Sequence, residues 1–249
     1  MNTQTIAISP LKLLMPLLLA LPLAGCEQQA IKAYNQPIFD PGHHQSPINI
    51  FTKTTQKDFE DQHFVIHFQD KVNAVENLGH TVQLDFAQGS TITANGVTYA
   101  FKQMHFHTPS EHLIDGITYP MEIHIVSEEE NSVAPHYLVV AVLFKMGEEN
   151  RFINEFINTV PKEKHSKANV ETDRVKLSDL FASIPEDNLG HHYHYQGSLT
   201  TPPYSENVNW FILKKIFEAS PEQINAINNI EGNNARHFEP NNDRAVEDN

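Results

Sequence analysis

The segment Tyr99–His107 restricts the fold of this chain more than any other stretch, because its side chains alternate with a period of two. Alternation of this kind is typical of a β-strand, in which successive side chains point to opposite faces. Gln103, His105 and His107 therefore share one face, and the apolar side chains between them share the other. The segment predicts a strand with one apolar face for the core and a polar face that carries two histidines.

Further short strands are expected on both sides of this segment. Strand-like patterns are present at 63–69, 80–86, 121–126 and 207–213. The pair Asn95-Gly96 lies between two alternating runs and predicts a two-residue hairpin, because both residues tolerate the positive φ angles of a type I′ turn. The chain is thus expected to be a mainly β (α+β) protein.

Helices are expected to be few, short and peripheral. Residues 151–160 place apolar side chains on one face, and Pro161 ends this pattern. Ser220 and Gln223 form a capping-box pattern at the start of a second helix, with a proline in its first turn and Gly232 as its stop.

Length and composition favour one globular domain. The chain has 249 residues, of which 40% are hydrophobic and 19% are charged, values that suit a packed domain rather than a disordered chain. Its formal net charge of −14 argues against nucleic acid as a partner, because phosphate binding requires clustered cations. Histidine is abundant, with 15 residues, so any single histidine is a weak indicator of a metal site.

The N-terminus is predicted to be a targeting segment rather than part of the fold. Lys12 precedes an apolar run at 13–23, which is too short for a membrane span and contains two prolines. The run ends in Leu23-Ala24-Gly25-Cys26, which resembles the bacterial lipobox. An ordinary signal peptide with a chance cysteine is the alternative. The expected division is a lipoprotein signal peptide at 1–25, a tether at 26–34 and the folded domain at 35–249.

Cys26 is the only cysteine of the chain and directly follows the predicted cleavage site. In the lipobox this cysteine receives a thioether-linked diacylglycerol, and additional acyl chains make the anchoring stable. The expected location is therefore the periplasm, with a lipid anchor in a membrane. Glu27 stands where an Asp commonly retains lipoproteins at the inner membrane, so the outer membrane is favoured. The domain itself is left without an internal disulfide.

His105 and His107, two positions apart on one strand face, can converge on a single metal ion. A catalytic zinc site needs a third protein ligand and an open position. The next strand candidate carries His124, and antiparallel pairing would place it beside the first two. Glu122 on the same face is suited to accept a hydrogen bond from an imidazole N–H, and Gln103 could do the same for His105. Polar strand faces also carry histidines without a metal, and the spacing alone leaves both interpretations open.

Five motifs together resemble the alpha-carbonic anhydrases, in which they occur in the same order. They are Gln45-Ser46-Pro47-Ile48-Asn49-Ile50, Gln103-Met104-His105-Phe106-His107, Ser110-Glu111-His112, Glu122-Ile123-His124 and Gly197-Ser198-Leu199-Thr200-Thr201-Pro202-Pro203. The resemblance extends from about Gln45 to Arg244, nearly the whole predicted domain. It implies a single domain on a large, twisted, mostly antiparallel central sheet of about ten strands, with zinc in a conical cavity.

The resemblance implies a zinc enzyme that interconverts carbon dioxide and bicarbonate. His105, His107 and His124 are then the zinc ligands, and water or hydroxide takes the fourth position. Zinc-bound hydroxide attacks carbon dioxide, which gives bicarbonate and a proton in a reversible reaction. Thr200 accepts the hydroxide proton and passes its own to Glu111, an arrangement that aims an oxygen lone pair at the substrate.

The resemblance also assigns a substrate site and a proton route. The apolar wall and substrate contacts map onto Val126, Val139, Leu199, Thr201 and Trp210. His80 matches the family's proton-shuttle residue, and histidine is the residue type that changes its charge nearest neutral pH. Five other histidines could form an auxiliary metal or proton-buffering site, although surface histidines are the simpler interpretation: His43, His44, His191, His192 and His194.

Two other functions fit parts of the sequence. A periplasmic zinc-binding or carrier protein without catalysis would explain the abundant histidines, but the intact Thr200 and Glu111 speak against it. A zinc peptidase is disfavoured because the spacing at 107–112 fits neither His-Glu-x-x-His nor its inverse.

The chain departs from many family members in lacking tryptophan at 34–44 and in carrying Tyr204 where many secreted members have a cysteine. A homodimer is expected only by analogy with bacterial members.

Overall fold

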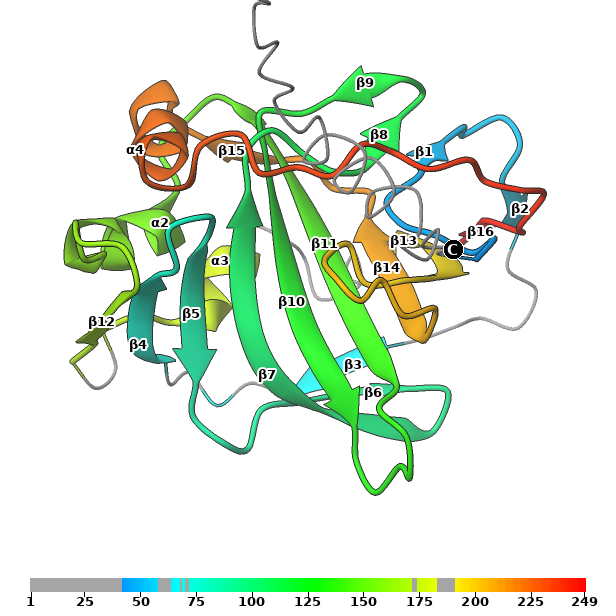
Figure 1. Cartoon of the computed structure of the whole chain (residues 1–249), viewed down its shortest axis with the longest axis horizontal. Helices are drawn as coiled ribbons and strands as arrows, with labels where there is room; N and C mark the ends of the chain where they lie inside the picture. The colour runs from blue at the N-terminus through cyan, green and yellow to red at the C-terminus, as the bar shows by residue number, and fades with distance from the viewer. Residues whose placement is uncertain (1–41, 58–63, 68, 70–71, 172–173, 183–190) are drawn as a thin grey trace, which may run out of the picture. The chain divides into compact units, whose positions relative to one another are not determined.

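The computed structural model describes residues 42–57, 64–67, 69, 72–171, 174–182 and 191–249 (Figure 1). The predicted signal peptide, Cys26 and the tether lie outside these residues. The described residues belong to one compact unit. No helix among them is long and apolar enough to cross a membrane.

A 13-stranded sheet dominates the described part of the chain (Figure 1). Its main hydrogen-bonded path runs through β12 (Ser166–Asn169), β4 (Val72–Asn77), β5 (Val82–Phe86), β7 (Val97–His107), β10 (Met121–Glu129), β11 (Tyr137–Met146), β14 (Val208–Leu213), β13 (His192–Gly197), β16 (Glu247–Asp248) and β2 (Gln56–Lys57). The strands β3 (Phe64–His67), β6 (Thr91–Ala94) and β15 (Phe217–Ala219) pair beside this path. A separate small sheet contains β1 (Asn49–Ile50), β8 (Leu113–Ile114) and β9 (Ile117–Thr118).

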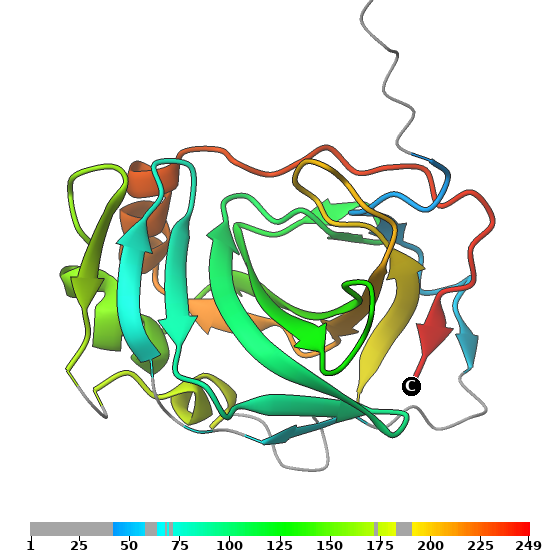
Figure 2. The same cartoon turned by 60° about the horizontal axis from the view of Figure 1, so that its bottom comes forward.

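The centre of the large sheet is antiparallel. The strands β5, β7, β10 and β11 are consecutive antiparallel neighbours, and β14 then joins β11 in parallel. The sheet is strongly twisted, and the long strand β7 curves across it (Figure 2). The predicted mainly β fold with a mostly antiparallel sheet is therefore confirmed.

Local sequence signals explain the hairpin that leads into β7. Asn95 and Gly96 both have positive φ angles, 50° and 77°, and their flanking residues Ala94 and Val97 are paired. Only residues that tolerate the left-handed region can close such a turn. The predicted hairpin is confirmed.

The helices within the described residues are α2 (Arg151–Phe156), the 3₁₀ turn η1 (Ile157–Thr159), α3 (Leu177–Phe181) and α4 (Pro221–Glu231). The helix predicted at 151–160 thus tightens into a 3₁₀ turn for its last part. In α4 the capping box is present, because the Ser220 side chain accepts from the Gln223 backbone and the Gln223 side chain accepts from the Ser220 backbone.

Alternation along β10 separates two apolar clusters on opposite faces of the sheet. Ile123 and Ile125 belong to one cluster, together with the buried apolar residues of α2, α3 and α4. Val126 and Trp210 belong to the other cluster. The ring of His124 lies 4.8 Å from that of Trp210, so the candidate metal ligands are on the second face, away from the helices.

Candidate metal centre

Strand pairing brings the three candidate ligands together. His124 on β10 is the direct partner of His105 on β7, and Glu122 is the partner of His107. The centroids of the three imidazole rings lie 4.5 to 5.2 Å apart. One nitrogen from each ring lies within 4.8 Å of the others, a spacing that can hold one metal ion. The antiparallel pairing expected from the sequence is therefore present.

Hydrogen bonds leave one ring nitrogen free on His105 and one on His124. Nδ1 of His105 lies 2.9 Å from Oε1 of Gln103, and Nε2 of His124 lies 2.7 Å from Oε1 of Glu122. Because an amide oxygen and a carboxylate can only accept, these ring nitrogens carry the protons. The buried ring of His107 has no hydrogen-bond partner on either nitrogen. A buried, unsatisfied imidazole beside two oriented ones fits a zinc ion with three nitrogen ligands.

Burial keeps these imidazoles neutral. Burial, and after it the neighbouring His124, lower the pKa of His105 to about 3. Burial also holds the pKa of His107 well below its usual range and lowers the pKa of His124. Neutral imidazole is the form that binds a metal, so no proton has to leave before the ligands can act.

The carboxylate of Glu122 is fully buried and accepts four hydrogen bonds. Oε2 accepts from the backbone N–H groups of Glu111 and His112, each at 2.8 Å. Oε1 lies 2.7 Å from both Nδ1 of His112 and Nε2 of His124. Although burial acts to raise it, these imidazoles hold the pKa of Glu122 well below its usual range. His112, Glu122 and His124 also satisfy the distances of a metal cluster, but their ligand atoms are already joined by hydrogen bonds.

Glu111 is buried beside two of the candidate ligands. Its Oε1 accepts a hydrogen bond from the backbone N–H of Arg236 at 2.8 Å and lies 3.5 Å from Nδ1 of His107. Its Oε2 lies 3.8 Å from Nδ1 of His124. Burial raises the pKa of Glu111 to about 8, while the Arg236 N–H and the buried hydroxyl of Thr200 act to lower it. Thr200 and Glu111 thus lie together next to the histidines.

A buried chain of hydrogen bonds fixes the loop that carries Thr200. The Tyr195 hydroxyl lies 2.8 Å from Nε2 of His112 and donates to Oγ of Ser46 at 2.9 Å. Ser46 in turn accepts from the backbone N–H of Ser198 at 3.0 Å, and the Ser46 N–H donates to Oγ of Ser198 at 2.9 Å. This chain connects three of the five sequence motifs.

Sequence reasoning did not single out Tyr195. A pattern in the sequence could have indicated this residue, because Tyr193 and Tyr195 alternate on the strand that leads into Gly197. A Cβ at Gly197 would lie 2.2 Å from Oγ of Ser46 and 2.8 Å from the Tyr195 ring. The close approach of these side chains therefore requires glycine at this position.

The residues expected to form the apolar wall are neighbours across three strands. Val126 is paired with Val139, and Val139 is paired with Trp210. Leu199 is partly buried and packs against the same cluster. Thr201 is exposed, on the loop after Thr200.

His80 is exposed on the turn before β5, with its Nδ1 3.2 Å from the carbonyl oxygen of Leu78. It is near enough to the candidate metal centre to act on the pKa of His105. The ring of Tyr204 covers the guanidinium of Arg236, which lies 4.1 Å from its ring centroid.

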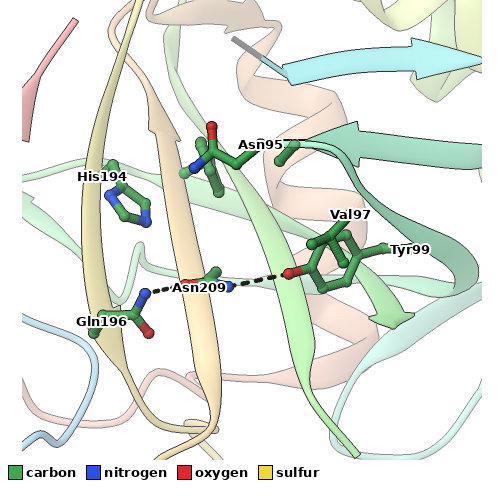
Figure 3. Close-up of a pocket in the computed structure, with 8 residues that line it drawn as sticks. Asn95, Val97, Tyr99, His194, Gln196 and Asn209 are labelled. Atoms are coloured by element: carbon green, nitrogen blue, oxygen red, sulfur yellow. Dashed lines mark hydrogen bonds between the residues drawn. The ribbon is translucent and has the colours of Figure 1, made fainter. Parts of the chain in front are cut away.

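A separate cavity of about 230 Å³ lies on the opposite face of the sheet (Figure 3). It is lined by Ala94, Asn95, Val97, Tyr99, His194, Gln196, Asn209 and Phe211. Three of its polar side chains are joined to one another, since Gln196 donates to Asn209 and Asn209 donates to the Tyr99 hydroxyl at 3.3 Å (Figure 3). None of the predicted catalytic, zinc-binding or substrate residues lines it.

The interpretation of five histidines as surface residues is wrong for two of them. His43, His44 and His191 are exposed, but His192 and His194 are buried on β13 and pack against Phe211. The physical reason is that this face of β13 is covered by the first apolar cluster. Among the described residues, no group with metal-binding distances includes any of the five.

Comparisons with known proteins identify the family of this chain. The family described as eukaryotic-type carbonic anhydrase matches residues 32–249. A carbonic anhydrase of Neisseria gonorrhoeae is 36% identical over 208 residues, which cover 82% of this chain and 77% of that protein. The alpha-carbonic anhydrase of Photobacterium profundum superposes with a TM-score of 0.74 at 32% identity, over 83% of this chain and 90% of that one.

The alpha-carbonic anhydrase of Thermovibrio ammonificans, solved with the inhibitor sulfanilamide, superposes with a TM-score of 0.75 at 33% identity. That match covers 83% of this chain and 87% of the other. Sequence and fold agree, and the chain therefore belongs to the family of alpha-type carbonic anhydrases.

Proposed function

We propose that this chain catalyses the zinc-dependent, reversible hydration of carbon dioxide to bicarbonate and a proton. His105, His107 and His124 hold the zinc ion, and His80 carries the proton away. The observation that carries the proposal is the buried ring of His107, which has no hydrogen-bond partner and faces two neighbouring histidines that each keep one nitrogen free.

The chain's own residues prepare the site. Zinc, when bound, supplies the positive charge that makes a water molecule nucleophilic near neutral pH and favours the ionised form of Glu111. Gln103 and Glu122 hold the rings of His105 and His124 in the orientation and tautomer that a metal needs.

Thr200 and Glu111 select and orient the reacting oxygen. The Glu111 carboxylate, which also accepts a hydrogen bond from the Arg236 N–H, accepts a hydrogen bond from the Thr200 hydroxyl. The Thr200 oxygen is then left as a hydrogen-bond acceptor, so that only a partner with a proton to donate is held in the productive orientation.

An apolar wall suits an apolar substrate. Val126, Val139 and Trp210 are adjacent across three strands, next to His124. Carbon dioxide needs no strong hydrogen bonds for binding, and the wall keeps it against the reactive centre while excluding excess water.

Metal removal and restoration test this proposal. A chelator should abolish carbon dioxide hydration in a stopped-flow assay, and one equivalent of zinc should restore it. His107→Ala should lose both bound zinc and activity, whereas His136→Ala, an exposed histidine after β10, should keep both. Zinc binding by the wild-type protein without hydration would favour a zinc carrier and refute the enzyme. Full activity and zinc content in His107→Ala would refute the ligand assignment.

We also propose that the mature chain is a periplasmic lipoprotein attached through Cys26, with the outer membrane as the favoured site. The support is the lipobox-like Leu23-Ala24-Gly25-Cys26 and the absence of Asp after it.

A homodimer is proposed by analogy with bacterial family members, and sedimentation equilibrium of the zinc-loaded protein would show a monomer if that analogy fails.

A further inference from the structure

Glu231 is a buried carboxyl group for which the proposed mechanism has no use. It is the last residue of α4, and only 7% of its surface is exposed. Its Oε2 accepts a hydrogen bond from the backbone N–H of Val82 at 3.1 Å. Its Oε1 accepts one from the Thr108 hydroxyl at 3.0 Å. A titratable group therefore connects the end of a helix to β5 and to the residue that directly follows β7.

A carboxyl group is electrostatically unfavourable at this place. The carbonyl groups at a helix C-terminus carry partial negative charge, and burial disfavours an ionised side chain. Burial raises the pKa of Glu231 to about 8, although hydrogen bonds from the Val82 N–H and the hydroxyls of Thr108 and Thr81 act to lower it. Near neutral pH, Glu231 therefore acts through its hydrogen bonds rather than through a negative charge.

The partners of Glu231 belong to the two segments that carry the candidate proton shuttle and the candidate ligands. Val82 lies two residues after His80, and Thr108 directly follows His107. The Glu231 side chain thus contacts residues close to the candidate shuttle His80 and to the candidate ligand His107, without touching either histidine.

Backbone pairing alone does not hold these two segments together. The register between β5 and β7 ends at Gln83 and His105. Past that pair, the Thr81 hydroxyl donates to the carbonyl oxygen of Phe106 at 2.7 Å and accepts from the Phe106 N–H at 3.3 Å. Side-chain hydrogen bonds have therefore replaced the regular ladder before the chain reaches His80.

Asn234, just after α4, completes this arrangement. Its Nδ2 donates to the carbonyl oxygens of His80 at 2.8 Å and Phe106 at 2.9 Å. Its Oδ1 accepts from the backbone N–H of Thr108 at 3.0 Å. We call the four side chains that join β5 to β7 beyond the ladder the β5–β7 clamp: Thr81, Thr108, Glu231 and Asn234.

We propose that Glu231 is a positioning residue for proton export, which sets the separation of His80 from the strand of zinc ligands through the β5–β7 clamp. This inference rests on the proposed function, because it assumes that His80 carries protons away from the zinc site. Proton transfer depends steeply on distance and geometry. A small displacement of His80 therefore slows proton export while the attack on carbon dioxide is unchanged.

The test compares turnover in weak and strong buffer for the zinc-loaded protein. In weak buffer, Glu231→Ala should lower kcat about three- to tenfold, and added imidazole should restore it by carrying the proton instead. The value of kcat/KM and the zinc content should stay at the wild-type level. Glu231→Gln, which can make the hydrogen bonds of a protonated carboxyl group, should keep the wild-type kcat. Glu222→Ala, at an exposed position in the first turn of the same helix, is the matched control.

A double variant identifies the step that is affected. His80→Ala should show the same loss restored by imidazole, and His80→Ala combined with Glu231→Ala should lose no more than His80→Ala alone. Should Glu231→Ala fail to fold, Thr81→Val removes one hydroxyl of the clamp and should reproduce the pattern.

Two results would overturn the role of Glu231. One is a wild-type kcat for Glu231→Ala in weak buffer; the other is a loss of zinc or kcat/KM as large as the loss of kcat. Failure of the proposed function looks different. In that case the zinc-loaded wild-type protein would not hydrate carbon dioxide, or His80→Ala would show no loss that imidazole restores.

Discussion

Oε1 of Glu122 lies 2.7 Å from Nε2 of His124, so the imidazole can offer only Nδ1 to a metal ion. The carboxylate cannot rotate away, because its other oxygen accepts two backbone N–H groups at 2.8 Å. The orientation of a candidate ligand is therefore fixed by the backbone of the loop at 111–112. This rigidity makes the site ready for the metal before it binds.

Glu122→Gln should lower zinc affinity about 10- to 100-fold. The amide replaces one of the two acceptor oxygens by an NH2 group, so the hydrogen bonds that this oxygen accepted are lost and the His124 ring is no longer held. Competition with a chromogenic chelator measures the affinity. Glu128→Gln, on the same strand but partly exposed and paired with Lys102, should bind zinc as the wild type does. Equal affinity in both variants would contradict the role of Glu122.

Thr200→Val should lower kcat/KM for carbon dioxide hydration about 100-fold, with bound zinc unchanged. The substitution keeps the shape of the side chain but removes the hydroxyl that orients the reacting oxygen. Stopped-flow kinetics and metal analysis on the same preparation separate the two effects. Thr200→Ser retains the hydroxyl and should remain close to wild type. A Thr200→Val protein with wild-type kcat/KM would exclude the hydroxyl from the mechanism.

Glu231 should make the stability of the protein depend on pH. Its folded-state pKa of about 8 lies above the ordinary value of 4.5, so the folded state binds this proton more tightly than the unfolded state. The resulting stabilisation is fully present below about pH 4.5 and is lost as the pH rises through about 8. Over this window the free energy of unfolding should fall by a few kcal/mol, and by at most about 5 kcal/mol.

Urea unfolding of the zinc-loaded wild type and Glu231→Gln measures this effect. Because glutamine does not titrate, the wild type should lose stability relative to Glu231→Gln as the pH rises from about 5 to about 9. Titration of the zinc ligands is common to both proteins and cancels in the difference. Parallel pH profiles would show that Glu231 is ionised to the same extent in the folded and unfolded states.

Cys26→Ser should abolish lipid attachment of the full-length chain expressed in a Gram-negative host. The wild-type protein should incorporate labelled palmitate and sediment with membranes, and the variant should do neither, because serine cannot form the thioether. Separation of inner and outer membranes then locates the wild-type protein. Release of unlabelled wild-type protein into the periplasm would favour an ordinary signal peptide.

Local sequence patterns predicted the elements that depend on neighbouring residues. The Asn95-Gly96 turn, the cap formed by Ser220 and Gln223, and the alternating strand at 97–107 are each decided within a few residues of chain. For the same reason, the shared face of His105 and His107 could be read directly from a period of two.

Other features depend on contacts between distant segments, which a single sequence does not contain. The hydrogen bonds that join Ser46 to Ser198, and Glu231 to Val82, span about 150 residues. The burial of His192 and His194 depends on which face of β13 the core covers, and periodicity does not say which face that is.

By itself the sequence determined which side chains share a strand face, where turns and caps occur, and which motifs resemble a known family. Only the tertiary structure decided that three imidazoles meet, that Glu122 fixes one of them, and that a buried glutamate joins the segment of the candidate shuttle to that of the candidate ligands. The physical reason is that side-chain direction follows from local backbone geometry, whereas register, burial and long-range hydrogen bonds exist only once the strands have paired.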